Sequence, residues 1–228
     1  MTSARVKFQA EEGDLQILQD RLVELGCQRA GIIKVADLRF RESVRRKCEY
    51  PNCGSYGNTF QCPPFAPKKE QMASCVSHSY EYGVVGVIYS SKEVMAIPAD
   101  GNVLETFANA GEWSDKLNNI VGKIESKAHE LGYYKAMGFN CGPCVCCGMW
   151  TKPWFDKVMT GQDAANCMVI RNGICRTHRR ARPSAEPLGI DIVELIKRRG
   201  WAPEDLIFPE MAAENVPECL YYAFVLAG

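Results

Sequence analysis

Segments rich in cysteine and in turn-forming residues constrain this chain more than any other feature. The first, CEYPNCGSYGNTFQCPP at 48–64, spaces Cys48, Cys53 and Cys62 as C-x4-C-x8-C among glycines, asparagines and prolines. The second, at 141–184, holds Cys141, Cys144, Cys146, Cys147, Cys167 and Cys175. Thiols that recur at short spacing in turn-rich sequence can converge on one point, as a tetrahedral metal ion or a cube-shaped cluster requires. The two segments therefore predict loops that bind metal or clusters.

The rest of the sequence predicts a reducing compartment for these thiols. The N-terminal MTSARVKFQAEEGD has no apolar run typical of a signal peptide, and the longest apolar stretches are about half of a membrane-spanning helix. We therefore expect a cytoplasmic chain without a membrane partner. There, twelve cysteines favour metal ligation or redox chemistry over disulfides. The 27 basic and 27 acidic residues give no overall field to attract nucleic acid, so none is expected as a partner.

Hydrophobic patterns alternate between helical and extended segments. Apolar residues at helical spacing predict helices over 14–26, 115–131 and 190–200. Runs rich in valine, isoleucine and aromatic residues predict strands over 30–38, 82–90, 133–139 and 219–227. Strands interleaved with helices indicate an α/β fold or a mixed α+β sandwich. We expect one compact domain over 1–228, a sheet flanked by helices from which the cysteine-rich loops extend.

The first cysteine segment contains three thiols, whereas a metal or a cluster usually takes four ligands. The fourth ligand could come from Cys27, Cys75 or Cys141. It could also be absent, which would leave an iron open to substrate. The sequence leaves these alternatives open.

The second segment has more thiols than one site needs. Cys141-x2-Cys144-x2-Cys147 is a run typical of [4Fe–4S] binding, with Cys167 or Cys175 as a distant fourth ligand. A different set of four also has a recognisable spacing, C-x2-C followed by C-x7-C: Cys144, Cys147, Cys167 and Cys175. The spacing leaves both sets open. Zinc sites usually combine two C-x2-C units, or one such unit with histidines, and neither segment has this pattern. Iron–sulfur clusters are therefore favoured over zinc.

Three motifs of this chain resemble those of one known family. CEYPNCGSYGNTFQCPP is similar to a C…C…YG…CPP signature, GPCVCC to a GPC-x2-C element, and CRTHRRARPSAEPLGIDI to a CR…ARPSMEA-GIDV stretch. All three belong to the DUF2284 family, cysteine-rich predicted metal-binding proteins widespread in anaerobic bacteria and archaea, and the matches run from Cys48 to Ile192. The resemblance implies metal or Fe–S binding. The second ligand set that it implies is Cys144, Cys147, Cys167 and Cys175.

The chain also differs from the pattern of that family. The segment between Cys147 and Cys167 is longer than in most family members, and Cys141 and Cys146 are additional. Thr177 and the histidine after it stand where a proline is common. These differences concern the second ligand set more than the first.

Four residues that follow Cys175 are predicted to contact a cofactor: Arg176, Arg182, Ser184 and Glu186. Arg176 belongs to a run of arginines beside Cys175. Guanidinium groups there can compensate the negative charge of a thiolate-ligated cluster, or bind a small anionic substrate or an acidic partner. The other three belong to the stretch that resembles the family.

The sequence thus predicts an iron–sulfur protein that carries two [4Fe–4S] clusters and exchanges electrons with a redox partner protein. A second hypothesis is a redox enzyme or accessory activator that uses an iron with an open position. A third is a zinc-binding structural or interaction module without redox chemistry. Whether the chain is an enzyme is not decided by these patterns.

Overall fold

A computed structural model of the chain describes residues 7, 9–50, 53–90, 103–149, 151–160, 167–202 and 219–228. The strands are β1 (Arg29–Lys34), β2 (Tyr82–Ser90), β3 (Met137–Phe139) and β4 (Cys219–Ala227). The α-helices are α1 (Glu12–Glu24), α2 (Glu42–Arg46), α3 (Lys69–Ser79), α4 (Val103–Glu130), α5 (Lys152–Met159), α6 (Met168–Asn172) and α7 (Ile192–Arg198). Two 3-10 helices, η1 (Val35–Asp37) and η3 (Glu186–Leu188), complete the described elements.

The four described strands form one antiparallel sheet in the order β1-β2-β4-β3. Its centre is the β2–β4 pair, whose register runs over nine residues from Tyr82 opposite Ala227 to Ser90 opposite Cys219. These strands coincide with the predicted strands at 82–90 and 219–227. The sheet and its helices confirm the prediction of a mixed α+β fold.

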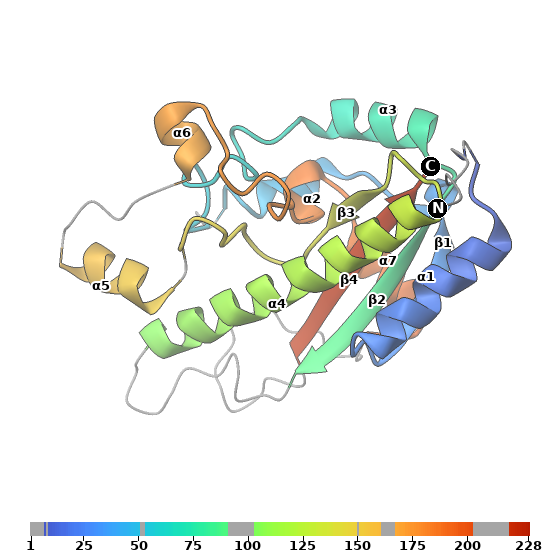
Figure 1. Cartoon of the computed structure of the whole chain (residues 1–228). Coiled ribbons are helices and arrows are strands. Elements are labelled where there is room, and N and C mark those ends of the chain that lie inside the picture. The colour runs from blue at the N-terminus through green and yellow to red at the C-terminus, as the bar shows by residue number, and fades with distance from the viewer. Residues whose placement is uncertain are drawn as a thin grey trace.

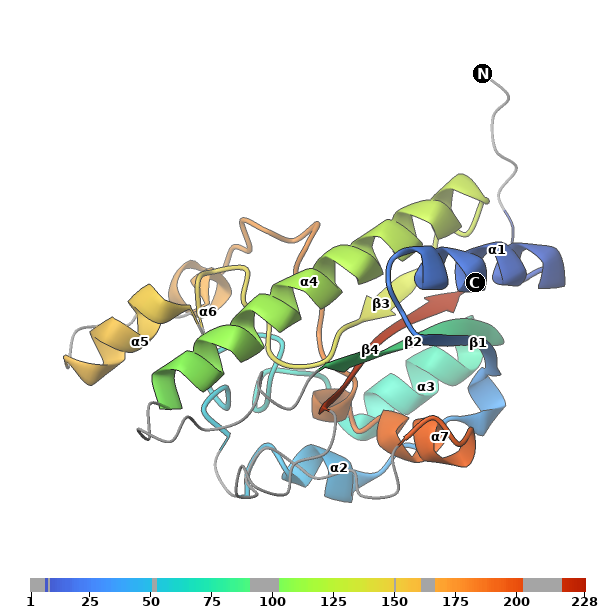
Figure 2. The same ribbon diagram turned by 90° about the horizontal axis from the view of Figure 1, so that it is seen from below.

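Helices cover both faces of the sheet, and each face has its own apolar core (Figure 2). Side chains along β4 alternate between the cores: Phe224 and Leu226 pack toward α7, whereas Ala223 and Val225 pack toward α1 and α4. This alternation is the period of two expected of a strand. The central strands are therefore buried on both faces. That all of residues 1–228 form one domain stays a prediction.

Four predicted elements differ in length from those observed. The strand expected at 30–38 ends at Lys34 and is followed by η1, and the helix expected at 190–200 is confined to Ile192–Arg198. The helix expected at 115–131 begins at Val103 and is thus more than a turn longer at its N-terminal side. The strand expected at 133–139 is confined to Met137–Phe139. The amide of Tyr133 donates instead to the carbonyl of Ala128, so the residues after α4 still complete the helix end. The ring of Tyr133 is buried, and this aromatic residue is one reason why the sequence resembled a strand.

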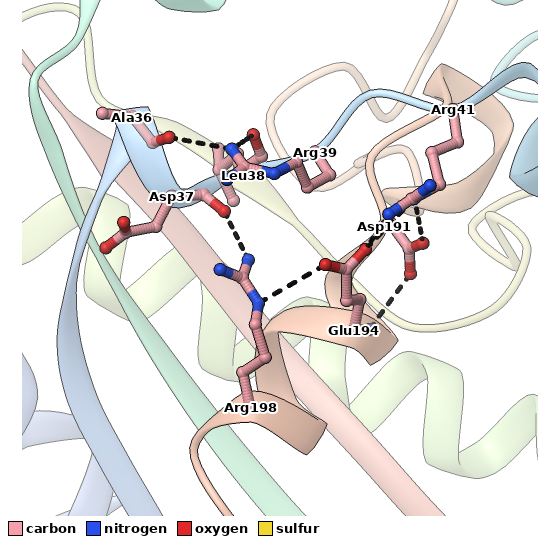
Figure 3. A network of polar contacts seen from close by, with 8 residues as sticks. All are labelled: Ala36, Asp37, Leu38, Arg39, Arg41, Asp191, Glu194 and Arg198. Atoms are coloured by element: carbon pink, nitrogen blue, oxygen red, sulfur yellow. Dashed lines mark hydrogen bonds and ion pairs between the residues drawn. The ribbon is translucent and has the colours of Figure 1, made fainter.

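A network of ion pairs holds α7 against the chain that leads into α2 (Figure 3). Arg41 pairs with Asp191 at 3.1 Å and with Glu194 at 2.6 Å. Asp191 also caps α7 by accepting from the amide of Glu194, and Arg198 donates to the carbonyl of Asp37. Exposed pairs of this kind contribute little energy. Their effect here is to set the path of the chain just before the first cysteine segment.

Both cysteine segments lie beyond the same end of the sheet (Figure 1). The first follows α2, and the second begins at Cys141, directly after β3 and Asn140, which forms an isolated β-bridge with Ser184. Within the described part of the chain, no helix is long and apolar enough to cross a membrane.

Close contact between α4 and β3 leaves no room for a side chain at Gly138. A Cβ atom there would lie 2.2 Å from Cγ1 of Val121 and 2.9 Å from Oε1 of Glu125. We expect Gly138→Ala to lower the free energy of unfolding of the metal-free protein by about 1–3 kcal/mol, measured by urea denaturation. Gly122→Ala, on α4 with open space around it, is the control and should raise stability by up to about 1 kcal/mol. Equal effects of the two variants would contradict the close packing.

Candidate metal centre

The first cysteine segment folds into successive turns after α2. The amide of Cys53 donates to the carbonyl of Cys48 at 3.1 Å, and the amide of Gly57 donates to the carbonyl of Pro63 at 2.8 Å. Gly57 has a φ of +70°, a conformation that glycine adopts without strain. The second bond closes the loop and returns Cys62 to the interior, where it is buried.

The three thiols of this loop lie within range of one another's charge. Burial, together with negative charge on Cys53, Cys62 and Glu186, raises the pKa of the Cys48 thiol to about 12. Burial also raises the pKa of Cys62 to about 11, with added contributions from Cys53, Glu186 and Cys167. Several thiolates can coexist here only if a cation offsets their repulsion. A bound metal supplies such a cation.

A buried hydroxyl beside these thiols also fits a metal–sulfur group. Thr59 is 1% exposed, and its Oγ1 has no hydrogen-bond partner in the described part of the chain. The same hydroxyl faces the sulfur of Cys62, and it lowers the pKa of that thiol by hydrogen bonding to the thiolate form. Buried polar groups are rarely left unsatisfied. Because donors to ligand sulfur are a regular feature of cluster sites, a thiolate-ligated metal or cluster would give Thr59 its missing acceptor.

The second segment contains a tightly coupled thiol pair. Cys144 donates a hydrogen bond to Cys146, which raises the pKa of Cys144 and lowers that of Cys146. The charge of Arg180 and a hydrogen bond with Thr177 favour the Cys146 thiolate further, against the effect of burial. Cys146 was not among the predicted ligands. Its position directly before Cys147 was the sequence signal that could have identified it.

The two segments meet at Cys167. This buried residue donates from its amide to the carbonyl of Asn58, in the first loop, at 3.4 Å. Its thiol charge raises the pKa of Cys62 in the first segment and that of Cys147 in the second. Cys175 acts on Cys147 in the same way. The structure thus brings the predicted ligands of both segments into one region, next to α6 (Figure 1).

The thiols approach one another without closing a coordination shell. Among the described residues, no three side chains of cysteine, histidine, aspartate or glutamate are placed to hold a metal ion as they stand.

Two cysteines predicted as a fourth ligand lie elsewhere. Cys27 is 3% exposed in the core between α1 and β2, and burial raises the pKa of its thiol to about 12. Its sulfur would lie 2.6 Å from a Cβ atom at Gly86, which shows how closely β2 packs on it. Cys75 is exposed on α3. Cys141 is half-buried and packs against both cores at the end of β3, so it begins the second loop.

Three of the predicted cofactor residues take part in buried polar contacts. Ser184 and Tyr222 both donate to the carboxylate of Glu186, the tyrosine at 2.6 Å. Burial raises the pKa of Glu186, and its charge reaches Cys48 and Cys62 as described above. Arg182 pairs with the buried Glu125, which also accepts from the amide of Gly138. The described contacts thus place Glu186 beside the first cysteine loop and Arg182 against α4 and β3.

The remaining arginines of this segment are exposed. Arg176 and Arg179 lie at the surface, and Arg180 pairs with Asp115 of α4 at 2.8 Å. Arg179 and Arg180 also border an open groove of about 930 Å³ between α1 and α4. A basic surface therefore runs from the second cysteine loop toward this groove.

An α+β fold that brings two thiol-rich loops together defines a cysteine-rich protein of the metal-binding class. A family model described as "Predicted metal-binding protein (DUF2284)" matches residues 31–226, which is most of the chain. The chain belongs to this family, and the family predicted from its motifs is confirmed. No curated protein and no solved structure matches it.

The hydrogen-bonded pair of Cys144 and Cys146 predicts that the Cys146 thiol reacts selectively in the metal-free protein. Because the thiolate is the nucleophile, alkylation of Cys146 by iodoacetamide should rise with pH about two units below the same cysteine in urea. Cys144→Ala removes the hydrogen bond to Cys146 and should shift the profile to higher pH. Peptide mass spectrometry after timed alkylation measures both. A Cys146 profile that is the same in the folded and unfolded protein would contradict the pairing.

Proposed function

We propose that this chain is an iron–sulfur protein that binds two [4Fe–4S] clusters and transfers electrons. The observation that carries the proposal is the meeting of the two thiol-rich loops at Cys167, which acts on both Cys62 and Cys147. Two sites side by side allow electrons to pass within the molecule. Such clusters, when bound, supply one-electron chemistry. The chain contributes thiolate ligands and a partly buried setting.

Cys167 is proposed as the fourth ligand of the first set, with Cys48, Cys53 and Cys62. The bond from its amide to Asn58 supports this assignment, since it ties the residue to the first loop. The second set then draws on the thiols that remain: Cys141, Cys144, Cys146, Cys147 and Cys175. This differs from the set implied by family resemblance, in which Cys167 joins Cys144, Cys147 and Cys175.

One observation favours an alternative function, that of a redox enzyme or accessory activator. If Cys167 belongs to the second set and Cys141 stays with the second loop, the first keeps three thiols, because Cys27 lies in the core and Cys75 on the surface of α3. An iron with an open position could then act as a Lewis acid on a small anionic substrate. Glu186, whose charge reaches two of the three thiols, would border that position.

A redox partner protein with an acidic surface is proposed to dock on the basic surface beside Cys175. Arg176 and Arg179 are exposed there, and charge complementarity of this kind raises association rates. A cytoplasmic location is proposed with it, because thiols stay reduced there.

The proposal is tested by anaerobic purification with metal and sulfide analysis and an absorption spectrum. About eight irons with matching sulfide per chain are expected, from two cubane clusters. Cys48→Ser and Cys144→Ser should each lose about half of the iron, from different clusters. Cys75→Ser, on α3, is the matched control and should retain all of it.

Other outcomes identify the alternatives. Zinc in a colourless protein would reject the iron–sulfur reading in favour of a structural module, since zinc has no redox chemistry. If the spectrum left by Cys167→Ser matches that of Cys144→Ser rather than Cys48→Ser, Cys167 belongs to the second set. In that case, full retention of the first cluster in Cys141→Ser would indicate an open position at the first site, as the enzyme alternative requires.

A further inference from the structure

Among the described residues, Arg45 and Glu125 are the charged residues with less than a tenth of their surface exposed, and the carboxylate of the half-buried Glu186 is shielded as well. Glu125 has a cation beside it, because Arg182 pairs with its carboxylate. Arg45, in the last turn of α2, is 7% exposed and has no carboxylate partner in the described part of the chain. Glu125 thus has an oppositely charged partner, whereas Arg45 has none among the described residues.

The guanidinium of Arg45 is bonded to backbone carbonyls alone. It donates to Pro67 at 2.9 Å, to Pro187 at 2.5 Å and to Ala66 at 3.3 Å. Glu186, next to Pro187, does not pair with it, since its carboxylate accepts from Ser184 and Tyr222 instead. These carbonyls satisfy hydrogen bonds without cancelling the charge. A buried charge that lacks a counter-ion is costly, so an anion is expected close by.

The first cysteine loop is where that anion would lie. The amide of Cys48 donates to the carbonyl of Arg45 at 3.0 Å, and the charge of Arg45 acts on the Cys48 thiol. A metal or cluster held by several thiolates carries net negative charge. The uncompensated cation and the thiolate-ligated group therefore complement each other.

We propose that Arg45 is the internal counter-charge of the group bound by Cys48, Cys53 and Cys62, and that it favours the reduced state of that group. This inference rests on the proposed function. Taking up one electron from a partner protein adds one negative charge at the site, and no bond of the chain forms or breaks. A fixed positive charge nearby stabilises the more negative state, so it raises the reduction potential.

Arg45 also joins three segments, because its carbonyl partners lie before α3 and in η3. A purely structural role would change stability when the residue is replaced. It would not change the reduction potential in proportion to charge. The test must therefore separate charge from hydrogen bonding.

The experiment compares Arg45→Met, Arg45→Lys and Arg46→Met by EPR-monitored redox titration of the whole protein. The step to follow is the one that disappears in Cys48→Ser. At the potential that half-reduces the parent, Arg45→Met should be about one-tenth reduced, a tenfold shift that corresponds to about 1.4 kcal/mol. Arg45→Lys keeps the charge and should titrate like the parent. Arg46→Met removes the same charge from the exposed neighbour and should also titrate like the parent.

Two results would overturn the proposal. One is an unchanged potential in Arg45→Met, and the other is a shift in Arg45→Lys as large as that in Arg45→Met. If Arg45→Met fails to retain the first cluster, Arg45→Lys decides, because a counter-charge predicts full retention with the parent potential. Loss of the cluster in both variants would show that the carbonyl bonds, not the charge, are what the site requires.

Failure of the proposed function can be told apart from failure of this inference. If the purified protein contains zinc and no sulfide, electron transfer is rejected, but a zinc–thiolate site is still anionic. Competition with a chelator then tests Arg45: Arg45→Met should lower zinc affinity about tenfold, and Arg46→Met should leave it unchanged. Equal zinc affinity in both variants would reject the counter-charge independently.

Discussion

The pairing of β2 with β4 is the contact on which the rest of the structure depends. The two strands are separated by most of the chain, yet they pair over nine residues and are buried on both faces. Helices α1 and α4 pack on one face, α3 and α7 on the other. Because both faces are covered, the cysteine loops can leave only at an end of the sheet. The end at which β3 finishes carries both of them (Figure 1).

Charge is what makes this end of the sheet chemically distinct. Buried thiols raise one another's pKa there, and a buried threonine hydroxyl faces sulfur without an acceptor. A buried arginine lies beside them with carbonyls as its described partners. The thiolates need a cation and Arg45 needs an anion. A metal or cluster held by thiolates answers both requirements, since its metal ions offset the ligands while the whole group stays negative.

The fold could be predicted from local patterns where a segment is buried in a regular way. The strands at 82–90 and 219–227 were predicted with the bounds observed, because continuous apolar, β-branched and aromatic runs have few other solutions. The strand at 133–139 was predicted too long, because the hydrogen bond from the amide of Tyr133 to the carbonyl of Ala128 depends on how α4 ends. The partners of Arg45 are also beyond local patterns, because two of its acceptor segments are distant in sequence.

By itself, the sequence determined the family, the α+β class and the thiol-rich character of the two loops, because residue type, spacing and hydrophobic period are local properties. Only the tertiary structure decided that the loops adjoin at Cys167, that Cys27 is a core residue, and that Arg182 pairs with Glu125. It also decided that Arg45 is buried with backbone carbonyls, and no carboxylate, as its partners among the described residues. Each of these depends on which segments the central strand pair and its helices bring together, a long-range result that spacing along the chain does not encode.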